Sequence, residues 1–209
     1  MYSSVDTIWI LLGVILVFSM QAGFTMVETG LTRAKNAGNI IMTNFTNFAI
    51  CSLAFWAAGF GLMFGKSLFG IIGLPDFFIR GDYSTSSGNP TAVFVTYQSV
   101  LCAMAAAIPL GAMAERTKFS ALCLYSIGIS ILVYPFTGHW IWSGGWLWNL
   151  GFHDFAGSAA VHMVGGITAL VGAKMLGPRI GKYDKKGNPR AFLGHSITLT
   201  ALGVVILWF

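Results

Sequence analysis

Six long apolar segments alternate with short polar stretches along this chain of 209 residues. Each is close to the ~20 residues that an α-helix needs to cross a bilayer. The alternating segments of ~10 residues that are typical of transmembrane strands are absent from the sequence. The pattern therefore predicts an all-α integral membrane protein, a polytopic helix bundle within one transmembrane domain over residues 1–209. The predicted helices cover roughly residues 7–29, 39–64, 91–113, 119–142, 155–177 and 191–209.

The sixth segment stays apolar to Phe209 and has no polar flank. A helix that crosses a membrane usually ends in polar residues at the interface. We therefore expect the transmembrane domain to continue beyond residue 209.

The basic residues follow alternate segments. Lys66 and Arg80 follow the second segment, and none follows the fourth. Loops rich in Lys and Arg stay in the cytoplasm, so the pattern predicts a multi-pass protein of the cell (inner) membrane with its N-terminus outside. The other ten of the twelve basic residues follow the first, third and fifth segments: Arg33, Lys35, Arg116, Lys118, Lys174, Arg179, Lys182, Lys185, Lys186 and Arg190.

The composition agrees with a membrane class. The chain is 56% hydrophobic and 9% charged, against about 25% charged residues in an ordinary soluble domain. The net charge of +5 then reflects topology more than an acidic partner. The basic cluster at 182–190 is either a solvated loop or a docking site for lipid headgroups or a partner protein.

Asp154, Ser158 and His162 follow one another at intervals of four residues around the start of the fifth segment. On one continuous helix this spacing gives a shared stripe, with Asp154 and His162 about 12 Å apart along the axis. Ionisable residues inside membranes are rare and usually functional. His162, beside Gly165 and Gly166, is either a packing histidine or a pore-lining imidazole that exchanges protons.

Asp154 also occupies the position of a helix N-cap, where its carboxylate would accept the backbone N–H groups of residues 156 and 157. A carboxylate held in this way stays ionised and favours a cation nearby. The two roles are compatible.

Four tryptophans lie within nine residues of the loop HWIWSGGWLW: Trp140, Trp142, Trp146 and Trp148. They form either an interfacial aromatic belt or, for at least one of them, a π face offered to a cation at an outer vestibule.

The remaining polar residues do not indicate an enzyme. Glu28 suits an interhelical hydrogen bond near the end of the first segment, and Glu115 with Arg116 suits an interfacial ion pair. There is no H-E-x-x-H, no G-x-S-x-G and no phosphate-binding glycine loop. The three cysteines and four histidines have no metal-ligand spacing. We expect no cofactor, no metal and no nucleic-acid partner.

Four stretches resemble the ammonium transporter family, which includes the methylammonium permeases and is related to the Rhesus proteins. They run in order through the whole chain: QAGFTMVETGLTRAKNAGN (21–39), GAMAERTKFSA (111–121), HWIWSGGWLW (139–148) and DFAGSAAVHMVGG (154–166). The resemblance implies a homotrimer of eleven-helix subunits, each with a hydrophobic pore between two inverted repeats. This chain would supply the first repeat and most of helix six.

The resemblance also implies roles for individual residues. Trp142 resembles the outer tryptophan that recruits ammonium by cation–π contact, and Tyr97 matches a second vestibule aromatic. Asp154 resembles the buried aspartate needed for ammonium recognition. His162 resembles the first of two pore histidines, whose partner would lie on a later helix.

Leu101 stands where the family has the first gate phenylalanine, and leucine is a narrower plug without a π face. Two functions follow from the resemblance. The first is transport, in which ammonium (or methylammonium) loses a proton, ammonia crosses the pore, and His162 carries the proton. The second is an ammonium sensor that conducts little and signals to a fused cytoplasmic domain. A cytoplasmic nitrogen-regulatory protein is a further expected partner.

Overall fold

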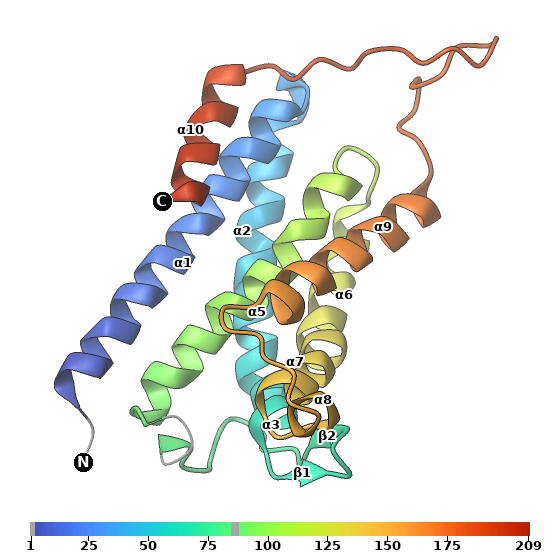
Figure 1. Cartoon of the computed structure of the whole chain (residues 1–209). Coiled ribbons are helices and arrows are strands. Elements are labelled where there is room, and N and C mark those ends of the chain that lie inside the picture. Colours follow the sequence, from blue (N-terminus) through green and yellow to red (C-terminus); the bar gives the residue numbers. More distant parts are fainter. Residues whose placement is uncertain (1–2, 85–87) are drawn as a thin grey trace.

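The computed structural model describes residues 3–84 and 88–209 and shows a bundle of helices (Figure 1). Within these residues, five helical spans are long and apolar enough to cross a membrane. They are Ser4–Leu31 (α1), Ala34–Phe64, Thr91–Met113 (α5), Phe119–Asn149 and Ser158–Leu176, and the shorter apolar helix α10 (Ile197–Trp208) follows them. The protein is thus an all-α, multi-pass membrane protein.

Three of these spans contain a π-helical turn, in which one extra residue widens the helix. The second span consists of a 3-10 turn (Ala34–Asn36), α2 (Ala37–Ala54), the π turn η2 (Phe55–Gly59) and α3 (Phe60–Phe64). The fourth span consists of α6 (Phe119–Gly128), the π turn η3 (Ile129–Val133), α7 (Tyr134–Trp142) and α8 (Trp146–Asn149). The fifth consists of the π turn η4 (Ser158–Met163) and α9 (Val164–Leu176).

Helix boundaries differ from the predicted ones where a polar side chain caps the helix. The sixth predicted segment starts at 191, but α10 begins at Ile197, because the Ser196 hydroxyl accepts the N–H of Leu199. Helix α1 begins at Ser4 rather than at residue 7, because Ser3 accepts the N–H of Asp6. Apolar patterning locates a span, whereas capping fixes its first residue.

Helix α5 lies at the centre of the bundle and contacts α1, α2 and α9 (Figure 1). Its middle is a run of fully buried small residues, 102–107, interrupted only by Met104. Small side chains let helices approach closely in lipid, where apolar burial gives no advantage over contact with lipid tails. Helices α1 and α10 cross in the same manner at Gly23 and Gly203, where a Cβ on either glycine would meet the other helix.

One end of the bundle holds the start of α1, residues 65–84 and 88–90, and the loop 143–157, and we call it the vestibule end. Here β1 (Ser67–Leu68) and β2 (Ile72–Gly73) form an antiparallel pair in which Ser67 faces Gly73. His139 is fully buried beneath them and bonds the Met63 carbonyl and the Ser67 hydroxyl. The predicted external loop at 66–90 is therefore tied to the helices, although its residues 85–87 lie outside the described residues.

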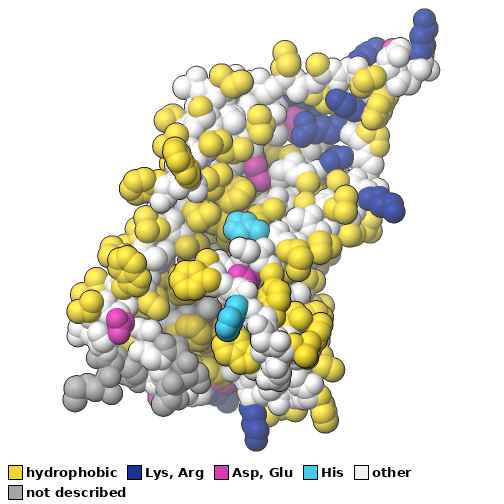
Figure 2. Space-filling view, viewed as in Figure 1, with side chains coloured by type: hydrophobic (Ala, Val, Ile, Leu, Met, Phe, Trp, Pro, Cys, Tyr) yellow, Lys and Arg dark blue, Asp and Glu magenta, His cyan; other side chains and the backbone are white. Residues whose placement is uncertain are grey.

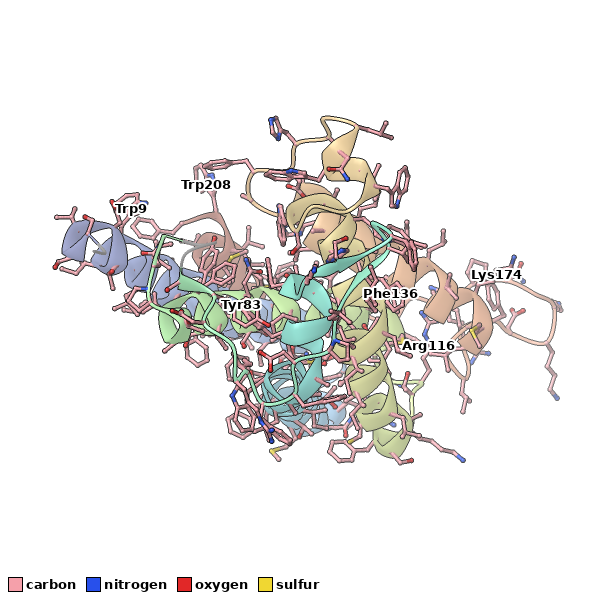
Figure 3. All side chains as sticks on the ribbon, turned by 90° about the horizontal axis from the view of Figure 1, so that it is seen from below. Trp9, Tyr83, Arg116, Phe136, Lys174 and Trp208 are labelled. Carbon is pink, nitrogen blue, oxygen red and sulfur yellow. The ribbon has the colours of Figure 1, made fainter. Side chains whose placement is uncertain are left out.

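Asp76 organises the next part of this loop. Its carboxylate accepts the N–H groups of Arg80 and Gly81 and the hydroxyl of Tyr83, whose position is labelled in the end view of Figure 3. Burial alone would raise the pKa of Asp76, but these hydrogen bonds hold it below its ordinary value. Asp76 thus remains ionised at neutral pH.

The opposite end carries ten of the twelve basic residues, and we call it the basic end. Figure 2 shows Lys and Arg side chains gathered where α9 ends and the chain continues toward α10. Lys174 lies in the last turn of α9, and Arg116 follows the end of α5. The basic residues that follow the first, third and fifth segments in the sequence thus lie together at one end of the bundle.

Glu115, which follows α5, binds residues from two other interhelical connections at the basic end, the one after α1 and the one after α9. Its Oε1 atom lies 3.0 Å from Arg33 Nε and accepts the Asn36 amide, while Oε2 lies 2.9 Å from Arg179 Nη1. Burial raises the pKa of Glu115, and these donors more than offset that effect and leave it below its ordinary value. The predicted Glu115–Arg116 pair is wrong: Glu115 has a positive φ of 63°, and Arg116 instead binds the carbonyls of Ala112 and Gly177.

A polar cluster in the bundle core gives the first testable prediction. Asn47 is fully buried; its amide donates to the Ala103 carbonyl and its Oδ1 accepts the Ser126 hydroxyl at 2.7 Å. Replacing Asn47 with Leu removes both hydrogen bonds from a buried polar cluster, so we expect a loss of about 1–2 kcal/mol of unfolding free energy. Thermal unfolding in detergent would measure it. Asn39→Leu, at an exposed position of α2, is the matched control, and equal losses would contradict the assignment.

Candidate functional site

A cavity of about 540 Å³ opens at the vestibule end. Helix α5 contributes Tyr97 and Leu101, and α7 contributes Trp142 from its last turn. The connection to the fifth span contributes Asp154. The structure thus brings four of the five predicted site residues around one space. The complete lining is Tyr97, Gln98, Leu101, Trp142, His153, Asp154, Phe155 and Ala156.

Asp154 is held by four backbone donors. Its Oδ1 accepts the N–H groups of Gly157 and Ser158 at 2.8 and 2.9 Å, and its Oδ2 accepts those of Ala159 and Ala160 at 2.9 and 2.8 Å. The predicted capping role is present: residue 157 donates as expected, residue 156 does not, and residues 158–160 donate in addition. These are the N–H groups that a helix start leaves without partners.

The charge of Asp154 follows from this geometry. Partial burial would raise the pKa of its carboxyl, but the four N–H donors lower it below the ordinary value. The carboxylate is therefore ionised at neutral pH. In the described parts of the chain no Lys or Arg forms a salt bridge with it, so its negative charge acts on whatever enters the cavity.

His162 lies elsewhere than the expected stripe. The fifth span begins at Ser158 and not at 155, so Asp154 precedes the helix. The first turn is a π turn, in which the His162 N–H reaches the carbonyl of Gly157, five residues back. Gly157 allows this entry because its φ is +98°. The expected stripe of Asp154, Ser158 and His162 is therefore wrong.

The His162 side chain is exposed on the described chain and does not line the cavity. It lies one helical turn from Gly165, which packs against Ile108 of α5. On the described chain the His162 side chain is thus uncovered, and it follows the cavity residues Asp154 to Ala156 along the sequence.

Trp142 is fixed to the Asp154 loop. Its indole Nε1–H donates to the Asp154 carbonyl at 2.6 Å, and the half-buried ring packs against the bundle core. Trp146 and Trp148 are more exposed, and Trp148 stacks edge-on with His153. Of the four loop tryptophans, Trp142 is the one that lines the cavity.

Gln98 and His153 line the cavity but did not stand out in the sequence. Gln98 is 7% exposed, and its Oε1 atom has no hydrogen-bond partner among the described residues. A buried carbonyl oxygen without a donor suits a ligand that donates hydrogen bonds. In the sequence, Gln98 could have been recognised as a polar amide next to Tyr97 in an otherwise apolar segment.

The cavity therefore suits a small cation that donates hydrogen bonds. Tyr97 and Trp142 offer aromatic rings, Asp154 supplies a negative charge, and Gln98 offers a free acceptor. Leu101, 7% exposed, closes the floor. Within the described residues no group of three or more His, Cys, Asp or Glu side chains is placed to hold a metal ion.

Known proteins are similar to this chain in sequence and in fold. A family model described as Ammonium Transporter Family matches residues 8–209. The ammonium transporter Amt2 of Archaeoglobus fulgidus is 45% identical over 98% of this chain and 45% of its own length. Ammonium transporter 3 of Dictyostelium discoideum is 42% identical over 98% of the chain and 46% of its own. The chain thus spans about half the length of these curated relatives.

Solved structures agree with the sequence relatives. A structure titled Sensor Amt Protein is 40% identical, with a TM-score of 0.90 over 97% of this chain and 52% of that one. The crystal structure of Saccharomyces cerevisiae Mep2 is 30% identical, with a TM-score of 0.87 over 100% of this chain and 47% of that one. Named transporters and a named sensor therefore share this fold.

The hydrogen bonds of Asp154 lead to a prediction about the cavity wall. Asp154→Ala removes acceptors for four N–H groups, so we expect a loss of about 2–3 kcal/mol of unfolding free energy and a shift in the fluorescence of Trp142. Asp184→Ala is the matched control, because the Asp184 carboxylate accepts the backbone N–H groups of Lys186 and Asn188 in an exposed hairpin. Thermal unfolding and tryptophan emission would measure both variants. If both lost equal stability, Asp154 would not organise the site.

Proposed function

Because this chain belongs to the ammonium transporter family, we propose that it forms the recruiting half of an ammonium pathway across the membrane. The observation that carries the proposal is the cavity itself. It unites Tyr97, Trp142 and the ionised Asp154 above an apolar floor at Leu101. Ammonium is a small cation with four N–H donors, and this lining offers rings, charge and an acceptor.

The first step is recruitment. Ammonium enters from the vestibule end and rests against the ring of Trp142, with Tyr97 on the other wall. Asp154 supports the cation through its electric field, since four backbone hydrogen bonds already hold both carboxylate oxygens. The carbonyl oxygen of Gln98 accepts an N–H group as the ion loses water.

The second step is separation of the charge. A full charge in a dry apolar passage is costly, so splitting ammonium into ammonia and a proton lowers the barrier. Ammonia crosses past Leu101, and His162 takes part in carrying the proton toward the basic end. His162 suits this role because an imidazole ring has one nitrogen that can donate a hydrogen bond and one that can accept it.

Ammonium sensing is the second candidate function. The observation that favours it is the close match in fold and sequence to the structure titled Sensor Amt Protein. In a sensor, the same cavity binds ammonium, the Leu101 floor stays closed, and binding shifts a conformation that a cytoplasmic partner reads.

The surrounding topology completes the proposal. The vestibule end faces the outside of the cell, and the basic end faces the cytoplasm, as the positive-inside rule favours. Exposed apolar side chains along α1, α9 and α10 suit contact with lipid and with neighbouring helices. A homotrimer in the cell membrane is the assembly we propose, with a nitrogen-regulatory protein as a cytoplasmic partner.

Ammonium-evoked current in proteoliposomes separates the two functions. We expect a wild-type current that falls by about tenfold or more in His162→Ala, because proton transfer loses its imidazole. We expect Leu101→Phe to keep the current. No current in the wild type, together with a gain in Leu101→Phe, would reject transport and support sensing.

Trp142 provides a separate test of recruitment. Trp142→Leu removes the π face but keeps an apolar side chain, so the ammonium concentration at half-maximal current or binding should rise by about three- to thirtyfold. Trp148→Leu is the matched control, since Trp148 lies in the same loop outside the cavity. Equal effects of the two substitutions would mean that Trp142 is a belt residue.

A further inference from the structure

Glu28 is a carboxylic acid buried inside the bundle. It lies one turn before the end of α1 and is 7% exposed. Its Oε2 atom accepts the Asn44 amide of α2 at 2.7 Å. On α5 it faces Gly111, where a Cβ would come within 3.0 Å of Glu28 Oε1. In the described ranges, the only other acidic residue inside a membrane-spanning helix is Asp6, in the first turn of α1.

Among the described residues, no Lys, Arg or His forms an ion pair with Glu28. Its neighbours on α2 and α5, Asn44 and Gly111, do not titrate, and α10 contains no titratable residue. Tyr125 of α6 is a titratable group that feels the charge of Glu28, and its hydroxyl donates to the Ala106 carbonyl. Arg33, beyond the end of α1, is committed to Glu115. A buried carboxylate without a countercharge is unfavourable in hydrocarbon, so a purely structural role would be served better by an amide.

Asn44 can serve both protonation states of Glu28. Its Nδ2 group donates to the carboxylate, while its Oδ1 atom is buried without a hydrogen-bond partner among the described residues. After rotation of the amide, that oxygen can accept the O–H of a protonated Glu28. The pair therefore tolerates both the gain and the loss of a proton.

Glu28 of α1 lies beside the part of α5 that is nearest the basic end. Leu101 lines the cavity, Ile108 packs beside Gly165 one turn past His162, and Gly111 meets Glu28. At 1.5 Å per residue, Gly111 lies about 15 Å from Leu101 toward the basic end. Glu28 thus lies beyond the level of His162, one turn of α5 before the Glu115 cluster.

We propose that Glu28 is the proton-exchange site through which the inner part of the pathway reaches water at the basic end. This proposal rests on the proposed function and deepens it. Ammonium loses a proton at the vestibule and becomes ammonia; the proton passes by His162 to the Glu28 carboxylate, which becomes a carboxylic acid. Glu28 then returns the proton to water at the basic end and is a carboxylate again. Only N–H and O–H bonds form and break, and no redox partner is required.

Infrared difference spectroscopy tests the proton site without transport. In the reconstituted protein, stepping the pH should give a carboxylic-acid C=O band that Glu28→Gln removes and Glu28→Asp restores. Glu115→Gln is the matched control, because it removes an ion-paired carboxyl outside the spans and should leave the band. Persistence of the band in Glu28→Gln, or failure of a folded Glu28→Asp to restore it, would overturn the proposal.

Transport then tests the role of the site. Glu28→Gln keeps the side-chain shape and an oxygen for Asn44, so we expect ammonia to pass while the ammonium-evoked current falls by about tenfold or more. Ammonia without its proton makes the vesicle lumen alkaline, and a pH dye inside the vesicles reports this. Loss of ammonia flux together with the current, or no change in either, would overturn the role. A wild type without current would reject transport as the function, and the infrared band would still decide whether Glu28 exchanges protons.

Discussion

The cost of leaving a polar group unpaired in hydrocarbon governs this structure. Its strongest expression is the Asp154 carboxylate, which satisfies four backbone N–H groups at the start of the fifth span. That interaction decides where the span begins, holds the loop whose carbonyl binds Trp142, and keeps a negative charge at the cavity. Helix start, aromatic wall and electrostatics of the site thus depend on one side chain.

The π turns show a second consequence of the same constraint. Turn η4 follows Asp154 directly and sets the direction of His162, while η2 and η3 lie against each other in the core. Gly59 of η2 sits so close to the Ser130 backbone of η3 that a side chain there would overlap it. The widened turns let helices stay hydrogen bonded while they bend around one another. Such turns are common at functional sites.

The cavity and its floor explain how one fold can serve transport or sensing. In the proposed function, recruitment requires only aromatic rings, a negative charge and a hydrogen-bond acceptor, which we assign to Tyr97, Trp142, Asp154 and Gln98. Conduction also requires that the floor at Leu101 yield and that a proton find its own route. A protein that keeps the first set and loses the second would bind ammonium without conducting it, so the residues on the basic side of Leu101 decide between the two functions.

The sequence by itself determined the class, the approximate positions of the spans and the grouping of the basic residues. It also singled out four side chains that line the cavity, namely Tyr97, Leu101, Trp142 and Asp154. These follow from hydrophobic length, charge bias and motif, which are local properties of the chain. Only the tertiary structure decided that Glu115 binds Arg33 and Arg179 rather than Arg116, that the stripe from Asp154 to His162 is broken, and that Gln98 lines the cavity. Those outcomes depend on capping, on a π turn and on partners from distant helices, which sequence spacing does not encode. The same reason applies to Glu28: the sequence placed a carboxyl near a helix end, and the packing of α1, α2 and α5 buried it with no ion-pair partner among the described residues.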